Sequence, residues 1–524
     1  MSSIFNDSKT FVDMPLKFPP NIILEKFQNL SDHSISSLNS FLTENFLPAG
    51  SEVLSTKPVD WHPNPKFLTE INNEDLKNWG SKIHAIWLDL FRVFDHNLSC
   101  SECFSSLKSP KPFIVPGGRF REYYYWDNLW IVEGLLVSEM LETSLDIVEN
   151  LLDMIEKYGF VWNGARLYYS KRSQPPVISL MIFEIYQEIS KGNSSKALNL
   201  LEKSYDLLLR EYNFWMKEKR CNIVNISKEL MDLNCYKGFS EMPRPESYKE
   251  DQLLAEKSQK INSSIFREII AGAETGWDFS SRFFEDFQNM TTINVSRMIP
   301  VDLNAILYKV EVTLSEISKI LNRKKDELFF REQSQLRKKT MMEILFDERT
   351  SQWRDADIEN LNKNPNFYLS NFIPLWAFDN IDDVQINEII GKIDQIQKNF
   401  IGGIPTSLKN SSQQWDFPNV WPPLQDFIIF GLNKRDDKYA KKVAFELAQK
   451  YIDNAFCGWS FSEAKMGKGA MFEKYNSLII GVSGSGGEYE AQEGFGWSNG
   501  VALKILKHFG KELRRPSCDT IKIE

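Results

Sequence analysis

The chain has 524 residues, of which 42% are hydrophobic, enough for one large domain or about three ordinary ones. Its formal net charge of −9 excludes the broad basic surface typical of proteins that bind nucleic acid or anionic membranes. No window reaches the roughly 18 consecutive apolar residues that a membrane span needs, so we expect neither nucleic acid nor a membrane as a partner.

Helical periodicity dominates the sequence. In chain order, apolar side chains recurring every three or four positions predict helices at about residues 145–155, 176–190, 197–218, 303–321, 325–346, 383–399, 437–453 and 497–509. Strand-like alternation is scarce, so any sheet should be minor. No long Pro- or Ser-rich linker divides the chain, and the sequence therefore predicts a single all-α domain over residues 1–524.

The chain contains six cysteines and five histidines, which do not suggest a dense disulfide framework or a histidine-rich metal site. Cys100 and Cys103 have the spacing of a redox or zinc motif, but no second pair accompanies them. We therefore expect structural thiols, and we predict neither a metal nor a cofactor.

The segments between the helices share one chemical character. They are rich in Trp, Tyr, Arg, acids and amides and contain almost no histidine. Aromatic faces stack on the C–H faces of sugars, while Arg, Asn and Asp pair with neighbouring hydroxyls, so this mixture suits a neutral polyhydroxylated ligand. Eight segments carry it: residues 116–128, 159–176, 241–251, 271–283, 402–408, 413–425, 471–476 and 484–500.

The segment AGAETGWDFSSRF places Asp278 directly after Gly276 and Trp277. A partly apolar wall, for which Trp277 and Phe279 are candidates, would favour the protonated form of this carboxyl group. Asp278 could instead cap a helix, and the acid Glu473 in MFEKYN could simply pair with Lys474 or a neighbouring arginine on the surface.

A glycine-rich stretch, Gly481 to Gly487, resembles a phosphate-binding loop, but the chain has no GxxxxGK[ST] motif. We interpret the stretch as a flexible cover over a pocket, because glycine adopts unusual backbone angles at little steric cost.

Long motifs give the chain a family resemblance. PGGRFREYYYWD (116–127) and QQWDFPNVWPP (413–423) resemble the two diagnostic signatures of the trehalase family of glycoside hydrolases. Further matches in family order include DSKTFVDM (7–14), GAETGWDFSSRF (272–283) and GGEYEAQEGFGWSNGV (486–501). The resemblance therefore covers essentially the whole chain.

The resemblance implies an (α/α)6 barrel of two concentric helical rings, with residues 1–60 as an N-terminal segment packed on it. It also implies hydrolysis of α,α-trehalose to two glucose molecules with inversion at the attacked carbon. Inversion needs two carboxyl groups roughly 6.5–9.5 Å apart, with a water between them. We expect a monomer or simple homodimer and, since no signal peptide or anchor is recognisable, a cytoplasmic location.

The resemblance also assigns roles to residues. Asp278 would be the general acid and Glu473 the general base. The three arginines among the binding residues would contact hydroxyls or hold carboxylates in place. The expected substrate-binding residues are Arg119, Trp126, Asp127, Asn163, Arg172, Ser173, Gln174, Arg244, Pro245, Glu246, Gly276, Trp415, Trp421, Glu488 and Trp497.

Two other functions compete with hydrolysis of trehalose. The first is a sugar-binding or regulatory protein that keeps the barrel without catalysis, against which the presence of both Asp278 and Glu473 argues. The second is another inverting enzyme, a phosphorylase or a glucosidase for a related disaccharide. A phosphorylase would need a phosphate site at the water position, where Glu473 is expected instead.

Overall fold

The computed structural model describes residues 4–518 apart from 99, 222, 224–231 and 259. The ends on which the expected location rests, residues 1–3 and 519–524, lie outside the described residues. Among the described helices, none combines the length and the apolar character needed to cross a bilayer.

Within this part of the chain, six helices form a closed inner ring. Each packs against the next in chain order, and the last returns to the first. Several of them are buried on nearly every side, as expected for helices that pack against both a partner ring and the barrel centre. The inner helices are α5 (Asp127–Val137), α7 (Ile178–Ser190), α11 (Val301–Ile320), α13 (Ile373–Ala377), α15 (Pro422–Asn433) and α17 (Gly496–Phe509).

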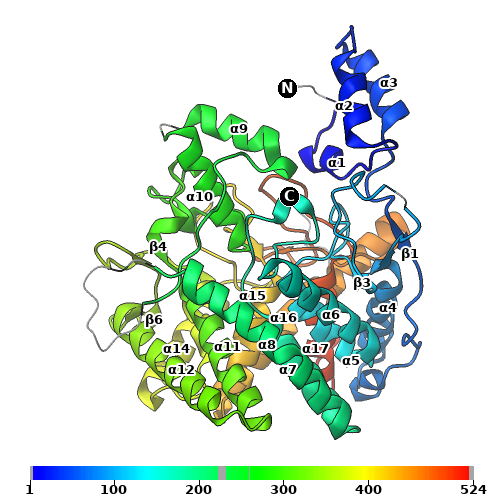
Figure 1. The fold of residues 1–524 in the computed structure, drawn as a ribbon. Coiled ribbons are helices and arrows are strands. Elements are labelled where there is room, and N and C mark those ends of the chain that lie inside the picture. The colour runs from blue at the N-terminus through cyan, green and yellow to red at the C-terminus, as the bar shows by residue number, and fades with distance from the viewer. Residues whose placement is uncertain (1–3, 99, 222, 224–231, 259, 519–524) are drawn as a thin grey trace, which may run out of the picture.

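A second set of six described helices surrounds this ring, and outer and inner helices alternate along the chain. The arrangement is an (α/α)6 barrel, which confirms the predicted fold class (Figure 1). The outer helices are α4 (Glu74–Leu90), α6 (Leu141–Tyr158), α8 (Ser194–Glu218), α12 (Lys324–Ile344), α14 (Asp383–Gln397) and α16 (Lys438–Met466).

The predicted helices are present, and their boundaries follow local capping. Helix α16 begins where Asp437 accepts a hydrogen bond from the Ala440 amide, and it continues past the predicted end at 453. It ends only at Gly467, whose positive φ of 73° forms a left-handed cap. The expectation that any sheet is minor is also confirmed, because every described strand has two to four residues.

The short strands fasten connections to one another. β1 (Val53–Ser55), β2 (Phe91–Phe94) and β3 (Phe113–Ile114) form one antiparallel sheet. Three two-stranded pairs also occur: β4 (Met298–Ile299) with β7 (Ala356–Asp357), β5 (Phe346–Asp347) with β6 (Gln352–Trp353), and β8 (Asn419–Val420) with β9 (Tyr475–Asn476). The β8–β9 pair joins the connection that precedes α15 to the one that precedes α17.

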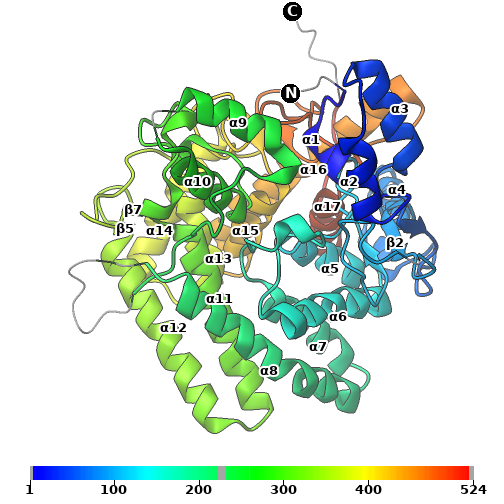
Figure 2. The same ribbon diagram turned by 45° about the horizontal axis from the view of Figure 1, so that its top comes forward.

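Additional helices gather at one end of the barrel (Figure 2). They are α1 (Ser8–Val12), α2 (Pro20–Gln28), α3 (Ile35–Asn45), α9 (Tyr248–Lys257) and α10 (Asn262–Glu274). Single-turn 3-10 helices occur at Lys66–Glu70, Leu167–Tyr169, Pro245–Ser247, Ser281–Phe283, Met290–Thr292, Val295–Arg297 and Leu369–Phe372. The N-terminal segment is attached through the Leu16 amide, which donates to the Cys103 carbonyl at 2.6 Å.

The cysteines form three disulfide bonds, so the expectation of structural thiols was wrong. The pairs are Cys100–Cys103, Cys221–Cys235 and Cys457–Cys518. The last two join positions far apart in sequence that spacing alone could not match. Disulfides persist mainly in oxidising compartments. The three disulfide bonds therefore argue against the cytoplasmic location. No observation tests the location directly, so it stays a prediction.

Candidate active site

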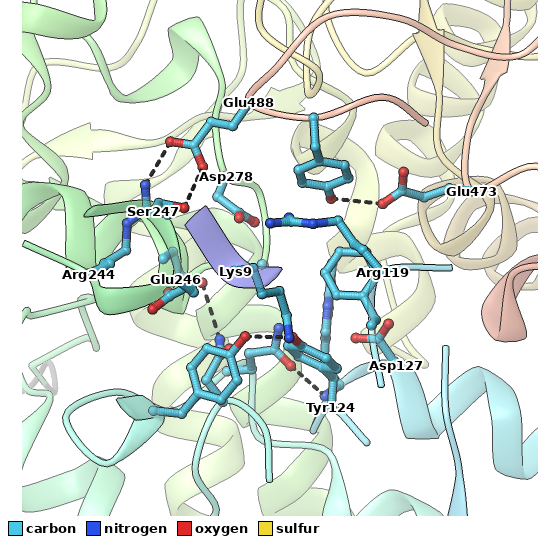
Figure 3. Close-up of a pocket in the computed structure, with 18 of the residues that line it drawn as sticks. Lys9, Arg119, Tyr124, Asp127, Arg244, Glu246, Ser247, Asp278, Glu473 and Glu488 are labelled. Atoms are coloured by element: carbon cyan, nitrogen blue, oxygen red, sulfur yellow. Dashed lines mark hydrogen bonds and ion pairs between the residues drawn. The ribbon is translucent and has the colours of Figure 1, made fainter. Parts of the chain in front are cut away.

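The pocket lies at the end of the barrel where outer helices connect to inner ones. Five such connections supply its walls, namely those leading into α5, α7, α11, α15 and α17. Residues far apart in sequence meet there because each connection reaches the N-terminal end of an inner helix. Figure 3 shows Asp278 and Glu473 reaching this pocket from different sides.

Asp278 follows the end of α10, on a turn that requires glycine. Gly276 has a φ of +75°, and a Cβ atom at this position would lie 2.6 Å from the Trp126 indole. This close approach allows the chain to pass beneath Trp126 and brings the next residues to the pocket wall. Gly276 therefore determines where the Asp278 carboxyl group is presented.

The Asp278 carboxyl group opens onto the pocket but is closely surrounded by protein. Burial raises its pKa to about 7, because desolvation disfavours the charged form. The Arg244 guanidinium opposes this shift, and the nearby Glu488 carboxylate adds to it. Asp278 can therefore retain a proton near neutral pH.

Trp277 and Phe279, the residues flanking Asp278, are buried but do not line the pocket, and their role as an apolar wall for this carboxyl group stays a prediction. Trp277 instead stacks on Trp415, with ring centres 5.3 Å apart, and Trp415 stacks on Trp421 at 3.7 Å. The Arg244 guanidinium lies over Phe279, and its central carbon is 5.1 Å from the centre of the Phe279 ring. Trp415 and Trp421 belong to the aromatic surface that lines the pocket, whereas the two residues adjacent to Asp278 do not.

Glu473 lines the same pocket, and protein donors fix both of its carboxylate oxygens. The Tyr489 hydroxyl donates to Oε1 at 2.9 Å, while the Gln492 amide and Lys474 Nζ lie 3.2 and 3.3 Å from Oε2. Burial raises the pKa of Tyr489, so this hydroxyl remains a donor. The suggested Glu473–Lys474 pair exists, but it is buried rather than at the surface.

Two arginines hold acidic residues around the pocket. Arg244 pairs with Asp251 and also with Glu488, each at 2.7 Å. Arg172 donates to one oxygen of Glu246, whose pKa is lowered by Arg172 and Arg244 although burial opposes the shift. Among the described contacts, Arg172 Nε and the second Glu246 oxygen are buried and have no hydrogen-bond partner.

A further carboxyl group of the pocket, Asp127, lies at the first turn of α5. Burial raises its pKa well above the usual range, and the nearby Glu473 and Asp278 act in the same direction.

Two hydrogen bonds hold other predicted binding residues in place. The Trp126 amide donates to the Gln174 side chain at 3.0 Å. Asn163 Nδ2 donates to the Ser173 carbonyl at 3.3 Å.

Two of the expected binding residues do not line the pocket. The Ser173 amide and hydroxyl point the other way, to Glu274 Oε1 at 2.9 Å and the Val161 carbonyl at 2.6 Å. Pro245 borders an apolar groove beside the N-terminal helices. The remaining members of the predicted set all line the pocket: Arg119, Trp126, Asp127, Asn163, Arg172, Gln174, Arg244, Glu246, Gly276, Asp278, Trp415, Trp421, Glu473, Glu488 and Trp497.

Several lining residues were not predicted. They are Lys9, Phe120, Tyr124, Tyr169, Ser247, Ala273, Tyr489 and Phe495. Tyr124 lies in the motif PGGRFREYYYWD and Tyr489 in GGEYEAQEGFGWSNGV. In these motifs the resemblance assigned substrate binding to their neighbours Trp126 and Glu488. Lys9 lies in the DSKTFVDM motif, which indicated the family but to which no chemical role was assigned.

Comparisons with known proteins identify the family of the chain. Residues 3–510 match the family described as trehalase. The chain belongs to the trehalase family. It is 40% identical to trehalase of Dictyostelium discoideum, covering 99% of this chain and 89% of that protein. It is also 40% identical to trehalase of Homo sapiens, covering 98% of this chain and 88% of that protein.

A solved structure shares the fold of this trehalase-family member. Neutral trehalase Nth1 from Saccharomyces cerevisiae superposes with a TM-score of 0.59 at 21% identity, covering 76% of this chain and 73% of that one. At this identity the likeness concerns the barrel alone. Family membership makes the chain a glycoside hydrolase.

Proposed function

We propose that this glycoside hydrolase converts α,α-trehalose to two glucose molecules with inversion at the attacked carbon. Asp278 acts as general acid and Glu473 as general base. The observation that carries the proposal is that both carboxyl groups line one pocket and have contrasting surroundings. Burial raises the pKa of Asp278 to about 7, whereas three donors from the protein surround Glu473.

In the proposed step, Asp278 gives its proton to the glycosidic oxygen as the bond from that oxygen to the attacked carbon breaks. A water molecule attacks this carbon from the opposite face, and Glu473 accepts a proton from the water. The leaving glucose keeps its α configuration, and the attacked one becomes β-glucose. Asp278 ends ionised and Glu473 protonated, and exchange with solvent restores both.

The remaining pocket residues fit a disaccharide. Trp415 and Trp421 offer apolar faces to sugar rings, and Arg172, Glu246, Asn163 and Gln174 offer polar groups to hydroxyls. Burial raises the pKa of Asp127, which favours the protonated form that can donate to a hydroxyl oxygen. This lining supports a neutral sugar rather than a charged substrate.

The test is incubation with trehalose, maltose and sucrose, following the product anomers by proton NMR before they equilibrate. We expect one α- and one β-glucose from trehalose. Two α-glucose molecules would contradict inversion, and no glucose release would favour a binding protein. Glucose release that requires inorganic phosphate, with glucose phosphate as the second product, would identify a phosphorylase.

A further inference from the structure

The first helix of the chain reaches the pocket from outside the barrel. Lys9, on α1, lines the pocket together with Asp278 and Glu473, and only 1% of its surface is exposed. Figure 3 shows α1 beside the pocket, with Lys9 pointing toward Tyr124. A segment that precedes every barrel helix thus contributes to the wall of the pocket.

Asp7, immediately before α1, holds a pocket arginine in a two-point contact. Arg119 Nε and Nη2 lie 2.8 and 2.6 Å from the two carboxylate oxygens of Asp7. The Arg119 amide also donates to Gln492 Oε1 at 2.8 Å. Because a planar guanidinium bound at two points cannot rotate freely, Asp7 determines how Arg119 faces the pocket.

Arg119 in turn contacts the residue that holds the proposed base. Its guanidinium carbon lies 4.5 Å from the centre of the Tyr489 ring, a cation–π distance. The Tyr489 hydroxyl is the donor to Glu473 Oε1. A continuous set of contacts therefore runs from Asp7 through Arg119 and Tyr489 to Glu473.

Lys9 acts on a different part of the wall. Its Nζ lies 2.7 Å from Glu122 Oε1 and 2.6 Å from Asp13 Oδ2, and it donates to the Tyr168 hydroxyl at 3.2 Å. These partners use all three donors of the ammonium group. Glu122 also accepts from the Tyr124 hydroxyl. Lys9 therefore supports the wall and is not free to bind a ligand.

We infer that Asp7, at the start of the N-terminal segment, is a positioning residue of the active site that acts through Arg119. The inference rests on the proposed function, since it concerns turnover of the same substrate. It gives this segment a role beyond packing on the barrel. Removal of the Asp7 charge should impair catalysis in a fully folded enzyme.

The decisive variant is Asp7→Asn. Asp7 also caps α1 by accepting from the Lys9 amide at 2.9 Å, and asparagine caps helices equally well, so this change removes the charge and keeps the helix. We expect kcat/KM on trehalose to fall about tenfold or more, with an unchanged melting temperature. Ser8→Ala, which removes a hydroxyl that donates to Glu250 from the same helix, should stay within about twofold.

Combination with Arg119→Lys distinguishes positioning from general weakening of the fold. Lysine cannot make the two-point contact, so Asp7→Asn should cost much less in the Arg119→Lys background than in the wild type. Equal losses in both backgrounds, or wild-type kinetics of folded Asp7→Asn, would overturn the inference. An Asp7→Asn variant that unfolds, while Asp7→Glu folds with wild-type kinetics, would also overturn it. A wild-type enzyme inactive on trehalose would instead contradict the proposed function.

Discussion

The acid side and the base side of the pocket are built differently. Asp278 stands on the connection between α10 and α11, where Glu274 and Arg282 are fully buried and do not line the pocket. Glu473 is held mainly by Tyr489 and Lys474, and Tyr489 itself faces the pocket. The scaffold thus holds the proposed acid, whereas Tyr489, a residue that lines the pocket, helps to hold the proposed base. Changes behind the acid should first reduce stability, and changes around the base should first reduce activity.

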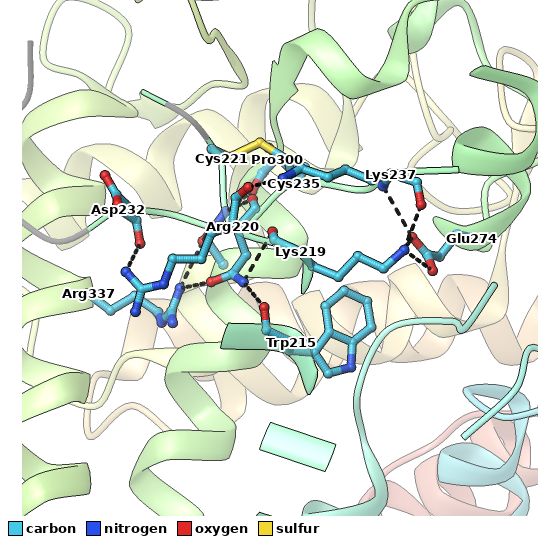
Figure 4. Close-up of a disulfide and its surroundings, with 12 residues drawn as sticks. Trp215, Lys219, Arg220, Cys221, Asp232, Cys235, Lys237, Glu274, Pro300 and Arg337 are labelled. Carbon is cyan, nitrogen blue, oxygen red and sulfur yellow. Dashed lines mark hydrogen bonds and ion pairs between the residues drawn. A yellow bond between two sulfur atoms is a disulfide. The ribbon is translucent and has the colours of Figure 1, made fainter. Parts of the chain in front are cut away.

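A buried ion pair supports the acid side from behind (Figure 4). Lys219 Nζ lies 2.7 Å from both oxygens of Glu274, and neither side chain is exposed. Glu274 also accepts from the Ser173 amide, next to the pocket residues of the connection into α7. The Cys221–Cys235 disulfide closes the chain just after Lys219, so one fastened cluster supports two walls of the pocket.

A second buried network fixes the residues after Asp278. Arg282 pairs with Asp302 at 2.8 Å and with Asp355 at 2.7 Å, and its guanidinium lies over the Trp277 ring at 4.6 Å. Asp302 belongs to the first turn of α11. The segment carrying Asp278 is therefore tied to the inner ring on one side and to the Lys219–Glu274 pair on the other.

The largest expected effect is loss of turnover on replacing either proposed catalytic residue. Asp278→Asn and Glu473→Gln should each lower kcat on trehalose by about a thousandfold, within the range for loss of a general acid or base. Initial rates of glucose release measure this. An Asp278→Asn enzyme that retains substantial activity would contradict the assignment.

The Asp278→Asn variant should also be more stable than the wild type at alkaline pH. Because folding raises the pKa of Asp278 from 3.8 to about 7, the wild type loses stability as pH rises between these values, and asparagine removes this loss. Melting temperatures at pH 5 and pH 8.5 measure the difference. A variant that is less stable at both pH values would contradict the buried-acid description.

The next largest effect tests the acid-side scaffold. Lys219→Met leaves the Glu274 carboxylate buried without its partner and should reduce the free energy of unfolding by about 3–5 kcal/mol. Urea unfolding followed by tryptophan fluorescence measures this. The double variant Lys219→Met/Glu274→Gln should recover much of the loss, because no buried charge remains uncompensated.

A surface pair supplies the control for that change. Lys82 lies 2.6 Å from Glu463, but both side chains are about half exposed, so Lys82→Met should cost no more than about 1 kcal/mol. If Lys219→Met and Lys82→Met destabilised the protein equally, the buried pair would not be the support described here.

A smaller effect, on activity, is expected on the base side. Tyr489→Phe removes the hydrogen bond to Glu473 and keeps the ring over which Arg119 lies, so kcat should fall about tenfold. The free energy of unfolding should change by less than about 1.5 kcal/mol. Tyr439→Phe, which removes a hydroxyl that donates to Asp394 far from the pocket, is the matched control. If Tyr489→Phe instead lost much stability and kept its kcat, the base side would behave as expected for the acid side.

These differences also explain how far the sequence could predict the fold. Most outer helices, such as α6, have one apolar face and were predicted from their periodicity, although the outer helix α4 was not. The inner helices α5 and α15 are buried on almost every side, so no stripe distinguished them, and they were not predicted. The barrel topology came only from the family resemblance, and which helices form each ring is defined by the contacts of the folded chain.

The pocket was predicted more completely than the groups that support it. Motif residues such as Arg172 and Glu246 meet because each lies on a connection that reaches the same end of the barrel. Ser173 was predicted to line the pocket but points away from it, because successive side chains of an extended segment point in opposite directions and its neighbours Arg172 and Gln174 face the pocket. Lys219 could not have been selected, since only the folded chain brings it to Glu274, which precedes Asp278 by four positions.

The smallest expected effect is a shift of the pH profile that separates the two sides. Only protonated Asp278 can donate, so kcat/KM should fall as pH rises through the pKa of about 7. The Glu488 carboxylate helps to keep that pKa high, while Arg244, its partner at 2.7 Å, opposes it. Glu488→Gln removes the negative charge, so the alkaline limb should move to lower pH by about one unit.

Tyr489→Phe provides the contrast for this measurement. It changes the surroundings of Glu473 without altering the charge near Asp278, so its alkaline limb should coincide with that of the wild type. Profiles of kcat/KM on trehalose between pH 5 and 9 compare the three enzymes. A limb that stays in place in Glu488→Gln, or moves to higher pH, would mean that a group other than Asp278 supplies the proton. The acid would then have to be sought among the other buried carboxyl groups of the pocket, beginning with Asp127, whose pKa burial also raises.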